Sequence, residues 1–231
     1  YRNRIQVNSI HDIIKGKDCV DFGCGNGVFC FALLDEGANS ATGIDFGTNS
    51  IRFAQKVAQE KNLVSKVSFI EEDVIKTSLE DNSFDFAIAN GVFHHLHMED
   101  MDKALCEVNR VLKKDGWFWY YTDGSNMIGM DLWDMSVDAL KGVNVIFIEN
   151  VLECMNVSQP KIAHVMDGLT ATYIHDDWEN VTQQLRRCGF DNFKRIIGGA
   201  PWDMDHDVIE RDPYGIEKFG SGDLRILCQK V

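Results

Sequence analysis

The sequence predicts an α/β protein with a doubly wound, mostly parallel sheet of seven strands and an antiparallel hairpin at one edge. First, short β-like runs alternate with helical stretches through the first half of the chain, the pattern of strands joined by crossover helices. Second, the run 84–89 is almost unbroken in apolar character, which suits a strand covered on both faces. Third, the chain ends in a helical pattern and two strands, over 193–197 and 223–231, which predict the hairpin.

The elements of the first half are expected in a regular order. Strands are expected over 18–22, 41–45, 67–70, 84–89 and 117–122, and helices over 28–36, from Thr48 or Asn49 as the N-cap to about Asn62, and over 100–112. The first of these helices has Phe29 and Leu33 at core spacing, and Gly37 follows it as a left-handed cap. Because ligands of such sheets bind at the carboxyl ends of the strands, the residues after each strand are the first place to look for function.

The alternation breaks down over 123–175. This stretch is expected to be helical over 128–140 and 149–157 with an interruption at Pro160, and we interpret it as an inserted helical cap. Asp176 or Asp177 then starts an amphipathic helix that Gly189 ends. A long loop is expected over 198–222.

The predicted domain organisation is a single domain over the whole chain. Its parts are a cofactor-binding core over 11–122, the cap over 123–175, and a terminal helix and hairpin over 176–231.

The charge balance excludes several kinds of partner. The 231 residues carry 23 Lys and Arg against 36 Asp and Glu, a net charge of −13, whereas nucleic acids and anionic membranes attract a basic surplus. We therefore expect neither partner, while the composition says nothing about oligomeric state. The seven cysteines include no C-x-x-C pair, and no apolar run approaches the roughly 18 residues of a membrane span. A reduced, cytoplasmic protein is expected.

The glycine cluster 23–27 is the most informative motif. It follows the first expected strand, and Asp45 ends the second. Glycines let the backbone approach a ligand, and a carboxylate at the second strand can accept ribose hydroxyls, so this pair predicts a nucleoside-containing cofactor. A dinucleotide fingerprint would require Gly or Ala where the chain has Val28, which disfavours a nucleotide-dependent oxidoreductase. Asp21 suits an ammonium group better than a pyrophosphate.

Five segments in this order and spacing resemble the class I S-adenosylmethionine-dependent methyltransferases. They are the loop 21–27, Asp45, the pair Asp73-Val74, the pair Asn90-Gly91, and the run 112–117. The match is strong over about 11–122 and general beyond it. The resemblance implies a Rossmann-like methyltransferase fold, S-adenosylmethionine as cofactor and S-adenosylhomocysteine as its product.

The resemblance also implies which residues bind the cofactor: Asp21, Phe22, Gly23, Cys24, Gly25, Asp45, Phe46, Asp73, Val74, Asn90 and Gly91. Asp21 and the loop backbone would hold the methionine part and Asp45 the ribose. Asp73 would bind the adenine amino group, with Phe46 and Val74 flanking the ring. The alternative is that Asp45 or Asp73 only caps a helix or turn.

Two histidines follow the fourth expected strand, at the place where the family has the transferring methyl group. His95, and after it His94, are the candidates for a general base or a substrate-orienting group, since a near-neutral imidazole can take a proton from a hydroxyl or amine. The alternatives are a structural histidine and a methyl transfer that needs in-line positioning alone.

Candidates for the substrate site come from the end of the fifth strand, the cap and the last loop: Tyr121, Asp123, Trp133, His175, Trp202 and Tyr214. The acidic run 203–207 lacks the spacing of a calcium loop and is interpreted as a solvated loop, with a role in binding a metal or a substrate cation as the alternative. Only Asp123 fits the acids of metal-dependent O-methyltransferases, so no metal is expected in the transfer step.

The sequence thus predicts an enzyme that moves the methyl group of S-adenosylmethionine to an oxygen or nitrogen of a small molecule, for example a sugar or a biosynthetic intermediate. The alternative is a non-catalytic module that binds the cofactor and acts as a regulator or assembly partner.

Overall fold

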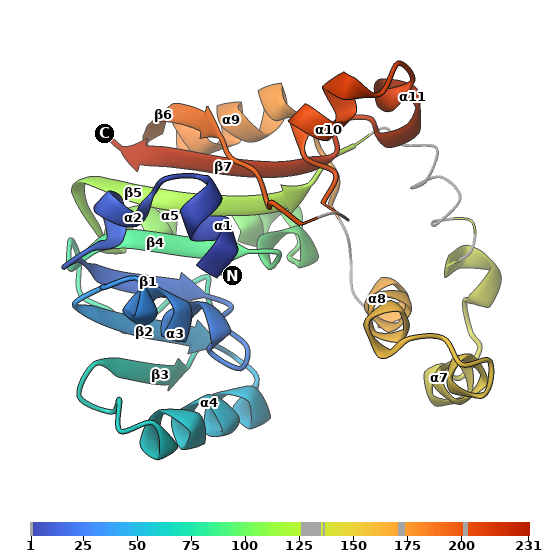
Figure 1. Ribbon diagram of the computed structural model, residues 1–231, viewed down its shortest axis with the longest axis horizontal. Coiled ribbons are helices and arrows are strands. Elements are labelled where there is room, and N and C mark those ends of the chain that lie inside the picture. Colours follow the sequence, from blue (N-terminus) through green and yellow to red (C-terminus); the bar gives the residue numbers. More distant parts are fainter. Residues whose placement is uncertain (1, 126–134, 136, 171–173, 201–202) are drawn as a thin grey trace.

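The computed structural model describes residues 2–125, 135, 137–170, 174–200 and 203–231. Its centre is a seven-stranded sheet in the order β3-β2-β1-β4-β5-β7-β6 (Figure 1). The first five strands are parallel and β7 runs antiparallel to both β5 and β6, so the predicted fold class is confirmed. The strands are β1 (Asp18–Phe22), β2 (Ser40–Asp45), β3 (Val67–Glu71), β4 (Phe84–Asn90), β5 (Leu112–Asp123), β6 (Phe190–Arg195) and β7 (Asp223–Lys230).

Helices cover both faces of the sheet. The named helices are α1 (Arg2–Val7), α2 (His11–Ile14), α3 (Val28–Asp35), α4 (Thr48–Glu60), the short 3-10 helix η1 (Phe93–His95), α5 (Met98–Val111), α7 (Val145–Cys154), α8 (Gln159–Thr170), α9 (Trp178–Arg187), α10 (His206–Arg211) and α11 (Gly215–Phe219). The apolar side chains of α5 and α9 pack in one buried cluster, and those of α1 to α3 pack in another.

The alternation of side chains along β5 explains these two layers. Phe118 and Tyr120 point to the cluster of α5 and α9, where Phe118 lies 5.2 Å from the ring of Phe190. Trp119, between them, points to the opposite face and packs edge-on against Phe29 of α3 at 6.1 Å. All three β5 side chains are buried, because a central strand with helices on both faces alternates between two cores.

Several predicted boundaries need correction. Gly47 is the N-cap residue of α4, because Thr48 is already helical and donates its hydroxyl to Glu71 at 2.7 Å. β5 begins at Leu112, where it pairs with Phe84, so the expected turn before Trp117 is a register shift within the strand. β6 begins at Phe190, before the predicted residue 193, since the buried Phe190 side chain anchors the strand.

The predicted loop over 198–222 is wrong in its central part, which contains α10 and α11. Both helices are short and partly exposed, so their apolar residues leave little periodic signal. The N-cap of α9, in contrast, is Asp177, one of the two residues predicted to start this helix, and its carboxylate accepts a hydrogen bond from the Asn180 amide.

The helices α7 and α8 form a pair, called here the arm, which stands apart from the sheet (Figure 1). α7 starts at Val145, four residues earlier than predicted, because Asn144 caps it through the amides of Ile146 and Phe147. Pro160 lies in the first turn of α8, where proline is tolerated, so it does not interrupt a helix. Most of the helix predicted over 128–140 lies outside the described residues.

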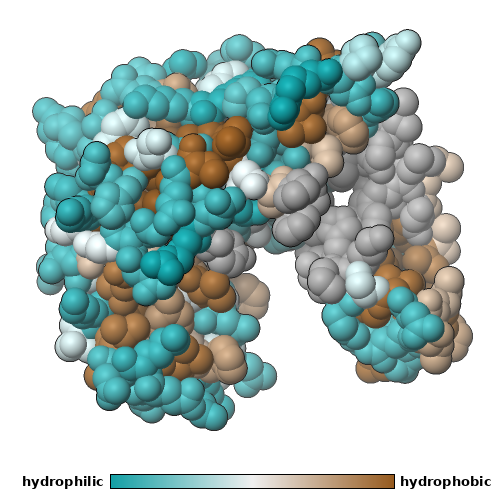
Figure 2. All heavy atoms as spheres, in the orientation of Figure 1, coloured by the Kyte–Doolittle hydropathy of each residue, from teal (hydrophilic) through white to brown (hydrophobic). Residues whose placement is uncertain are grey.

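The chain leaves and re-enters the sheet region at neighbouring points on either side of the arm. Gly124 forms a parallel bridge with Asp176, and the amide of Ser125 donates to the Asp176 carbonyl at 2.8 Å. In Figure 1 the parallel strands point toward the arm, and Figure 2 shows an open notch between the arm and the sheet. The arm thus faces the end of the sheet where ligands of this fold class bind. Among the described residues, no helix has the length and hydropathy needed to cross a membrane.

Candidate functional site

The loop from β1 to α3 forms a pocket of about 290 Å³ at the point where the strand order reverses between β1 and β4. Its lining residues are Asp21, Gly23, Cys24, Gly25, Asn26, Val28, Phe29 and Asn90. Open α/β sheets bind ligands at this reversal. The glycines shape the pocket, since Gly23 and Gly25 have positive φ angles of 74° and 49° and a β-carbon on Gly25 would meet open space.

Asp21 supplies a buried acid to this pocket. The side chain is 3% exposed, and burial raises the pKa of its carboxyl to about 8, helped by the nearby charge of Asp45 and opposed by a weak hydrogen bond from the Cys30 thiol. A carboxyl with this pKa is mostly neutral at pH 7 until a cation enters the pocket. Asp21 is therefore suited to bind an ammonium group, as its position before the glycine cluster predicts.

Asp45 is held at the end of β2 by two backbone amides. Its carboxylate accepts one hydrogen bond from the Gly25 amide at 2.8 Å and another from the Gly47 amide at 2.7 Å. The two bonds use different oxygens, and each carboxylate oxygen can accept a further bond. The Asp45 carboxylate thus closes the glycine loop and retains capacity for two ribose hydroxyls.

The residues expected around an adenine ring lie in different environments. Phe46 is 82% exposed and offers a free aromatic face next to Asp45, whereas Val74 is 5% exposed and belongs to the core beneath it. The Asp73 carboxylate is exposed and accepts the Ile75 amide at 3.1 Å, so it also makes the local turn that was the alternative to ligand binding. Phe22 is completely buried against Phe93 and leaves only its backbone for a ligand.

Asn90 provides a direct test of whether these residues fit S-adenosylmethionine. Its side-chain oxygen is buried in the pocket with Asp21, and no described residue donates a hydrogen bond to it. Buried polar atoms nearly always have a partner, so this oxygen calls for a donor from a ligand. An amino acid ammonium group would satisfy both Asn90 and Asp21, and the residues of the pocket therefore fit the methionine part of the cofactor.

The two histidines lie on η1, directly beyond this pocket. The Nε2 atoms of His94 and His95 are 3.1 Å apart, and the His94 Nε2 lies 3.9 Å from the Asp123 carboxylate. His94 is 4% exposed and His95 is half-buried. Burial lowers the pKa of His94 to about 4, with smaller effects from Asp123, which raises it, and from His95 and His175, which lower it. His94 is therefore neutral at pH 7.

Gly91 joins the cofactor pocket to the histidine cluster. A β-carbon at this residue would lie 3.3 Å from the Tyr121 ring and 3.8 Å from the His94 ring, so both rings pack on its backbone. Gly91 follows Asn90 directly and has a positive φ of 73°. The two parts of the predicted site, the cofactor residues and the histidines, are thus adjacent in the fold.

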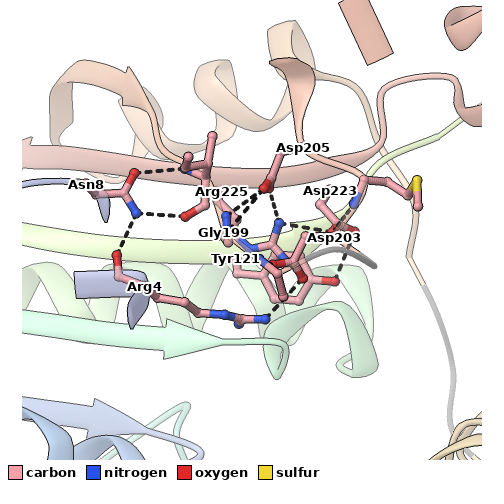
Figure 3. A network of polar contacts seen from close by, with 12 residues as sticks. Arg4, Asn8, Tyr121, Gly199, Asp203, Asp205, Asp223 and Arg225 are labelled. Atoms are coloured by element: carbon pink, nitrogen blue, oxygen red, sulfur yellow. Dashed lines mark hydrogen bonds and ion pairs between the residues drawn. The ribbon is translucent and has the colours of Figure 1, made fainter. Parts of the chain in front are cut away.

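Behind the histidines lies a buried ionic cluster around Arg225 of β7 (Figure 3). The Arg225 guanidinium pairs with Asp203 at 3.1 Å, with Asp223 at 3.0 Å and with Asp205. It also lies over the Tyr121 ring, 4.6 Å from the ring centre. Burial raises the pKa of Asp223, and the Arg225 charge opposes this effect.

Tyr121 connects this cluster to the histidines. Its hydroxyl donates to Asp123 at 2.7 Å and lies 3.3 Å from the Asp223 carboxylate (Figure 3). Burial, together with these two carboxylates, raises the pKa of Tyr121 well above its ordinary value, so the phenol remains a donor at neutral pH. The substrate candidates Tyr121 and Asp123 are thus hydrogen-bonded to each other, and the Asp123 carboxylate lies 3.9 Å from the ring of His94. The main-chain carbonyl of His94 accepts the Ile174 amide at 2.8 Å.

The interpretation of 203–207 as a solvated acidic loop is wrong. Asp203 and Asp205 are each 3% exposed, because they neutralise the buried Arg225 and accept backbone amides of residues 198–200. Arg4 of α1 adds a further bond to Asp203 at 3.2 Å (Figure 3). The missed signal was Arg225 itself, a cation between the apolar residues Leu224 and Ile226 of a strand, which requires buried acids as partners.

The remaining substrate candidates are divided. His175 lies close enough to His94 to lower its pKa, so it joins the histidine cluster. Tyr214 is 64% exposed and lines a separate surface hollow with Pro213 and Lys218, away from the cofactor pocket. Trp133 and Trp202 lie outside the described residues. In the described part of the chain, no group of three or more potential metal ligands occurs.

Comparison with known proteins agrees with this geometry. Residues 20–120 match the sequence profile of a family described as a methyltransferase domain. Over 110 residues, 48% of this chain, the sequence is 28% identical to methyltransferase phqN of Penicillium fellutanum, of which the match covers 33%. It is also 28% identical over 114 residues, 47% of this chain, to EEF1A lysine methyltransferase 2 of Homo sapiens, of which the match covers 48%. The chain spans less than half the length of these relatives.

A solved structure extends the likeness to the whole fold. The 1,6-didemethyltoxoflavin-N1-methyltransferase of Burkholderia thailandensis, solved with its substrate and S-adenosylhomocysteine bound, has a TM-score of 0.59 and 16% identity to this chain. The similarity covers 99% of this chain and 80% of that one, and at this identity it shows the fold alone. The family match and the glycine loop, with Asp21, Asp45 and Asn90 around it, make S-adenosylmethionine the cofactor. Residues 20–120 are therefore a methyltransferase domain of the class I, S-adenosylmethionine-dependent family.

Proposed function

We propose that the protein transfers the methyl group of S-adenosylmethionine to an oxygen or nitrogen of a small molecule. The observation that supports this proposal is the continuity of Asn90, which lines the cofactor pocket, with Gly91, whose backbone packs against the rings of His94 and Tyr121. An acceptor bound over these side chains would lie next to the methionine end of the cofactor. The names of the similar proteins include both a small molecule, 1,6-didemethyltoxoflavin, and a protein lysine, and the net charge of −13 gives no support to a nucleic acid acceptor.

The cofactor supplies an electrophilic methyl group when bound, and the protein has to place a nucleophile in line with it. Asp21, Asn90 and the loop amides would hold its methionine part, and Asp45 its ribose. The half-buried His95 is the proposed proton acceptor, because it is more accessible than His94. Neutral His94 would orient it through the 3.1 Å contact between the two Nε2 atoms, and the same His94 atom lies 3.9 Å from the Asp123 carboxylate.

The first test separates cofactor binding from catalysis. Calorimetry with S-adenosylmethionine is expected to give saturable binding in the wild type and about a hundredfold weaker binding in Asp45→Ala, because the proposed bonds from two ribose hydroxyls to a charged acceptor are lost. The exposed Asp35→Ala variant is the matched control and should bind as the wild type does. Unchanged affinity in Asp45→Ala would reject the proposed ribose site.

The second test addresses the base. A panel of hydroxyl and amine metabolites would be assayed for release of S-adenosylhomocysteine by the wild type and by His95→Ala. The variant is expected to bind the cofactor normally and to lose about a hundredfold in turnover, the ordinary contribution of a general base. If His95→Ala has normal turnover and a normal pH profile, His95 is not a base, and catalysis rests on the positioning of the acceptor and the methyl group.

A non-catalytic binding module is the second candidate, and the pKa of His94 favours it. A group with a pKa of about 4 is a poor base at neutral pH, so the buried histidine alone is not well matched to proton removal. If the protein binds S-adenosylmethionine tightly and releases no S-adenosylhomocysteine with any acceptor of the panel or with protein lysines, this candidate replaces the enzyme.

A further inference from the structure

Two cysteine thiols lie side by side outside the candidate site. Cys106 is on α5 and Cys188 follows the last residue of α9, and their sulfur atoms are 3.0 Å apart. They are separated by 82 residues in the chain, so no sequence spacing indicates the pair. A disulfide bond is about 2.0 Å long, and the two sulfurs therefore need to approach by only about 1 Å to bond.

Hydrogen bonds between α5 and the end of α9 keep the two thiols next to each other. The Gln184 side chain of α9 donates to the Asp102 carboxylate of α5 at 2.7 Å, on one side of Cys106. On its other side, the Asn109 side chain of α5 donates to the Gly189 carbonyl at 3.0 Å. These hydrogen bonds tie the same two segments together on both sides of the sulfurs.

The two thiols differ in access. Cys106 is exposed, whereas Cys188 is buried at 8% exposure, with its sulfur 3.7 Å from the Asp102 carbonyl. An external disulfide can therefore reach Cys106 but not Cys188. This is the arrangement in which an exposed thiol reacts first and a neighbouring thiol displaces the reagent.

We propose that Cys106 and Cys188 are a dithiol redox site that reacts with glutathione disulfide and closes to an intramolecular disulfide. In the first step the Cys106 thiolate attacks one sulfur of glutathione disulfide, a Cys106–glutathione bond forms, the glutathione S–S bond breaks, and one glutathione leaves. In the second step Cys188 loses its proton, attacks the Cys106 sulfur and expels the second glutathione. Two cysteine thiols are oxidised and one glutathione disulfide is reduced to two thiols.

The second step depends on the proton of Cys188. Burial and the neighbouring Cys106 raise the pKa of Cys188 to about 12, so only a small fraction is thiolate at pH 8. The short distance between the two sulfurs compensates for the small thiolate fraction, because an intramolecular attack has a high effective concentration. The closed disulfide would join α5, which begins soon after the histidine turn, to the end of α9. It closes a long loop, so it also stabilises the fold against heat.

The experiment uses the reduced full chain in glutathione redox buffers at pH 8, quenched with acid and analysed by intact mass and peptide mapping. The wild type is expected to lose two hydrogen atoms and to give a peptide pair linked through Cys106 and Cys188, with a higher Tm. The matched control lies in the same chain: Cys154 of α7 is also exposed, and it should carry glutathione without closing a disulfide.

Two variants test the order of the steps. Cys188→Ser cannot complete the second step, so glutathione should accumulate on Cys106 about tenfold above the wild-type level. Cys106→Ser should leave Cys188 reduced, and neither variant should show the rise in Tm. A stable glutathione adduct on Cys106 of the wild type, or a linked peptide containing another cysteine, would overturn the proposal. None of these readouts requires S-adenosylmethionine, so they stand apart from the proposed function.

Discussion

Asp21 is a residue whose burial lowers the stability of the fold at neutral pH while it prepares a site for a cationic ligand. Its unfolded-state pKa is near 3.9, whereas burial raises the folded pKa to about 8, so the native state holds the proton over this range. A raised carboxyl pKa means that stability falls as the pH rises from about 4 to about 8 and changes little beyond. A carboxyl that costs stability at neutral pH is expected where a ligand cation is to be bound.

The Asp21→Asn substitution is expected to stabilise the protein while weakening the site. Because the amide cannot ionise, the free energy of unfolding should exceed that of the wild type by on the order of 5 kcal/mol at pH 8 and should be nearly equal to it at pH 4. Urea titrations at the two pH values measure the difference. A larger free energy of unfolding for the wild type than for Asp21→Asn at pH 8 would show that the Asp21 pKa is not raised.

The same residue predicts a proton release on binding. At pH 7 the free Asp21 carboxyl is mostly protonated, and an ammonium group in the pocket favours its ionised form. Binding of S-adenosylmethionine should then release nearly one proton, measured by calorimetry in buffers with different heats of ionisation. Asp21→Asn should bind more weakly and release none. Equal proton release in both proteins would assign the proton to another group.

At the scale of elements, the loop between β1 and α3 contains two glycines that share a backbone conformation and differ in surroundings. Gly25 and Gly27 have φ angles of 49° and 77°, which cost about 1–2 kcal/mol for any residue with a β-carbon. A β-carbon at Gly25 would meet nothing within 4 Å, whereas at Gly27 it would lie 2.5 Å from the Phe69 ring. One glycine therefore serves the pocket, and the other serves the packing of α3 and α4.

These surroundings predict that the same substitution mainly lowers stability at Gly27 and mainly weakens cofactor binding at Gly25. Gly27→Ala should destabilise the fold by about 3 kcal/mol, since strain and overpacking add. Gly25→Ala should cost about 1 kcal/mol of stability and weaken S-adenosylmethionine binding at least tenfold, because its methyl group enters the pocket. Urea unfolding and calorimetry on both variants provide the comparison. If Gly25→Ala binds normally, the ligand does not approach this part of the loop.

The cluster around Arg225 links β7, β5, α1 and the segment before α10. Arg225→Met would leave Asp203, Asp205 and Asp223 buried without their cation, so a loss of about 3–5 kcal/mol in stability is expected. The control is Arg211→Met, which breaks an exposed pair with Asp207 and should cost less than about 1 kcal/mol. Urea denaturation compares the two. Equal losses would mean that the buried cluster is not structural.

For the whole molecule, the sequence predicted the sheet better than the parts that surround the acceptor site. The alternation of strands and helices and the glycine loop depend on local patterns, so β1 to β5 and the loop that lines the pocket could be predicted from the sequence. The burial of Asp203 and Asp205 depends on Arg225, about twenty residues away, and the contact of His94 with Asp123 depends on the pairing of β4 with β5. Such contacts follow from tertiary structure and leave no periodic signal.

The segment that contains the arm leaves the sheet after Ser125 and returns at Asp176, and these two residues are neighbours in the fold. Ser125 and Asp176 are joined by a hydrogen bond, and Gly124 pairs with Asp176, so a short linker can bridge the gap without moving either strand end. Ile146 and Phe147 of α7 and Met155, which follows α7, are each more than 60% exposed. The cofactor pocket, in contrast, is built from the sheet, the loop after β1 and the start of α3, without any residue of the arm.

We therefore predict that residues 127–173 determine the acceptor and are dispensable for the fold. A variant in which a short Gly-Ser linker replaces them should unfold cooperatively in urea and bind S-adenosylmethionine within about threefold of the wild type, because Asp21, Asp45 and Asn90 are untouched. Its methyl transfer should be lost, since the acceptor has no cover. Ile174, whose amide donates to the His94 carbonyl, is retained so that η1 keeps this hydrogen bond. Loss of cofactor binding or of cooperative unfolding would instead make this segment an integral part of the domain.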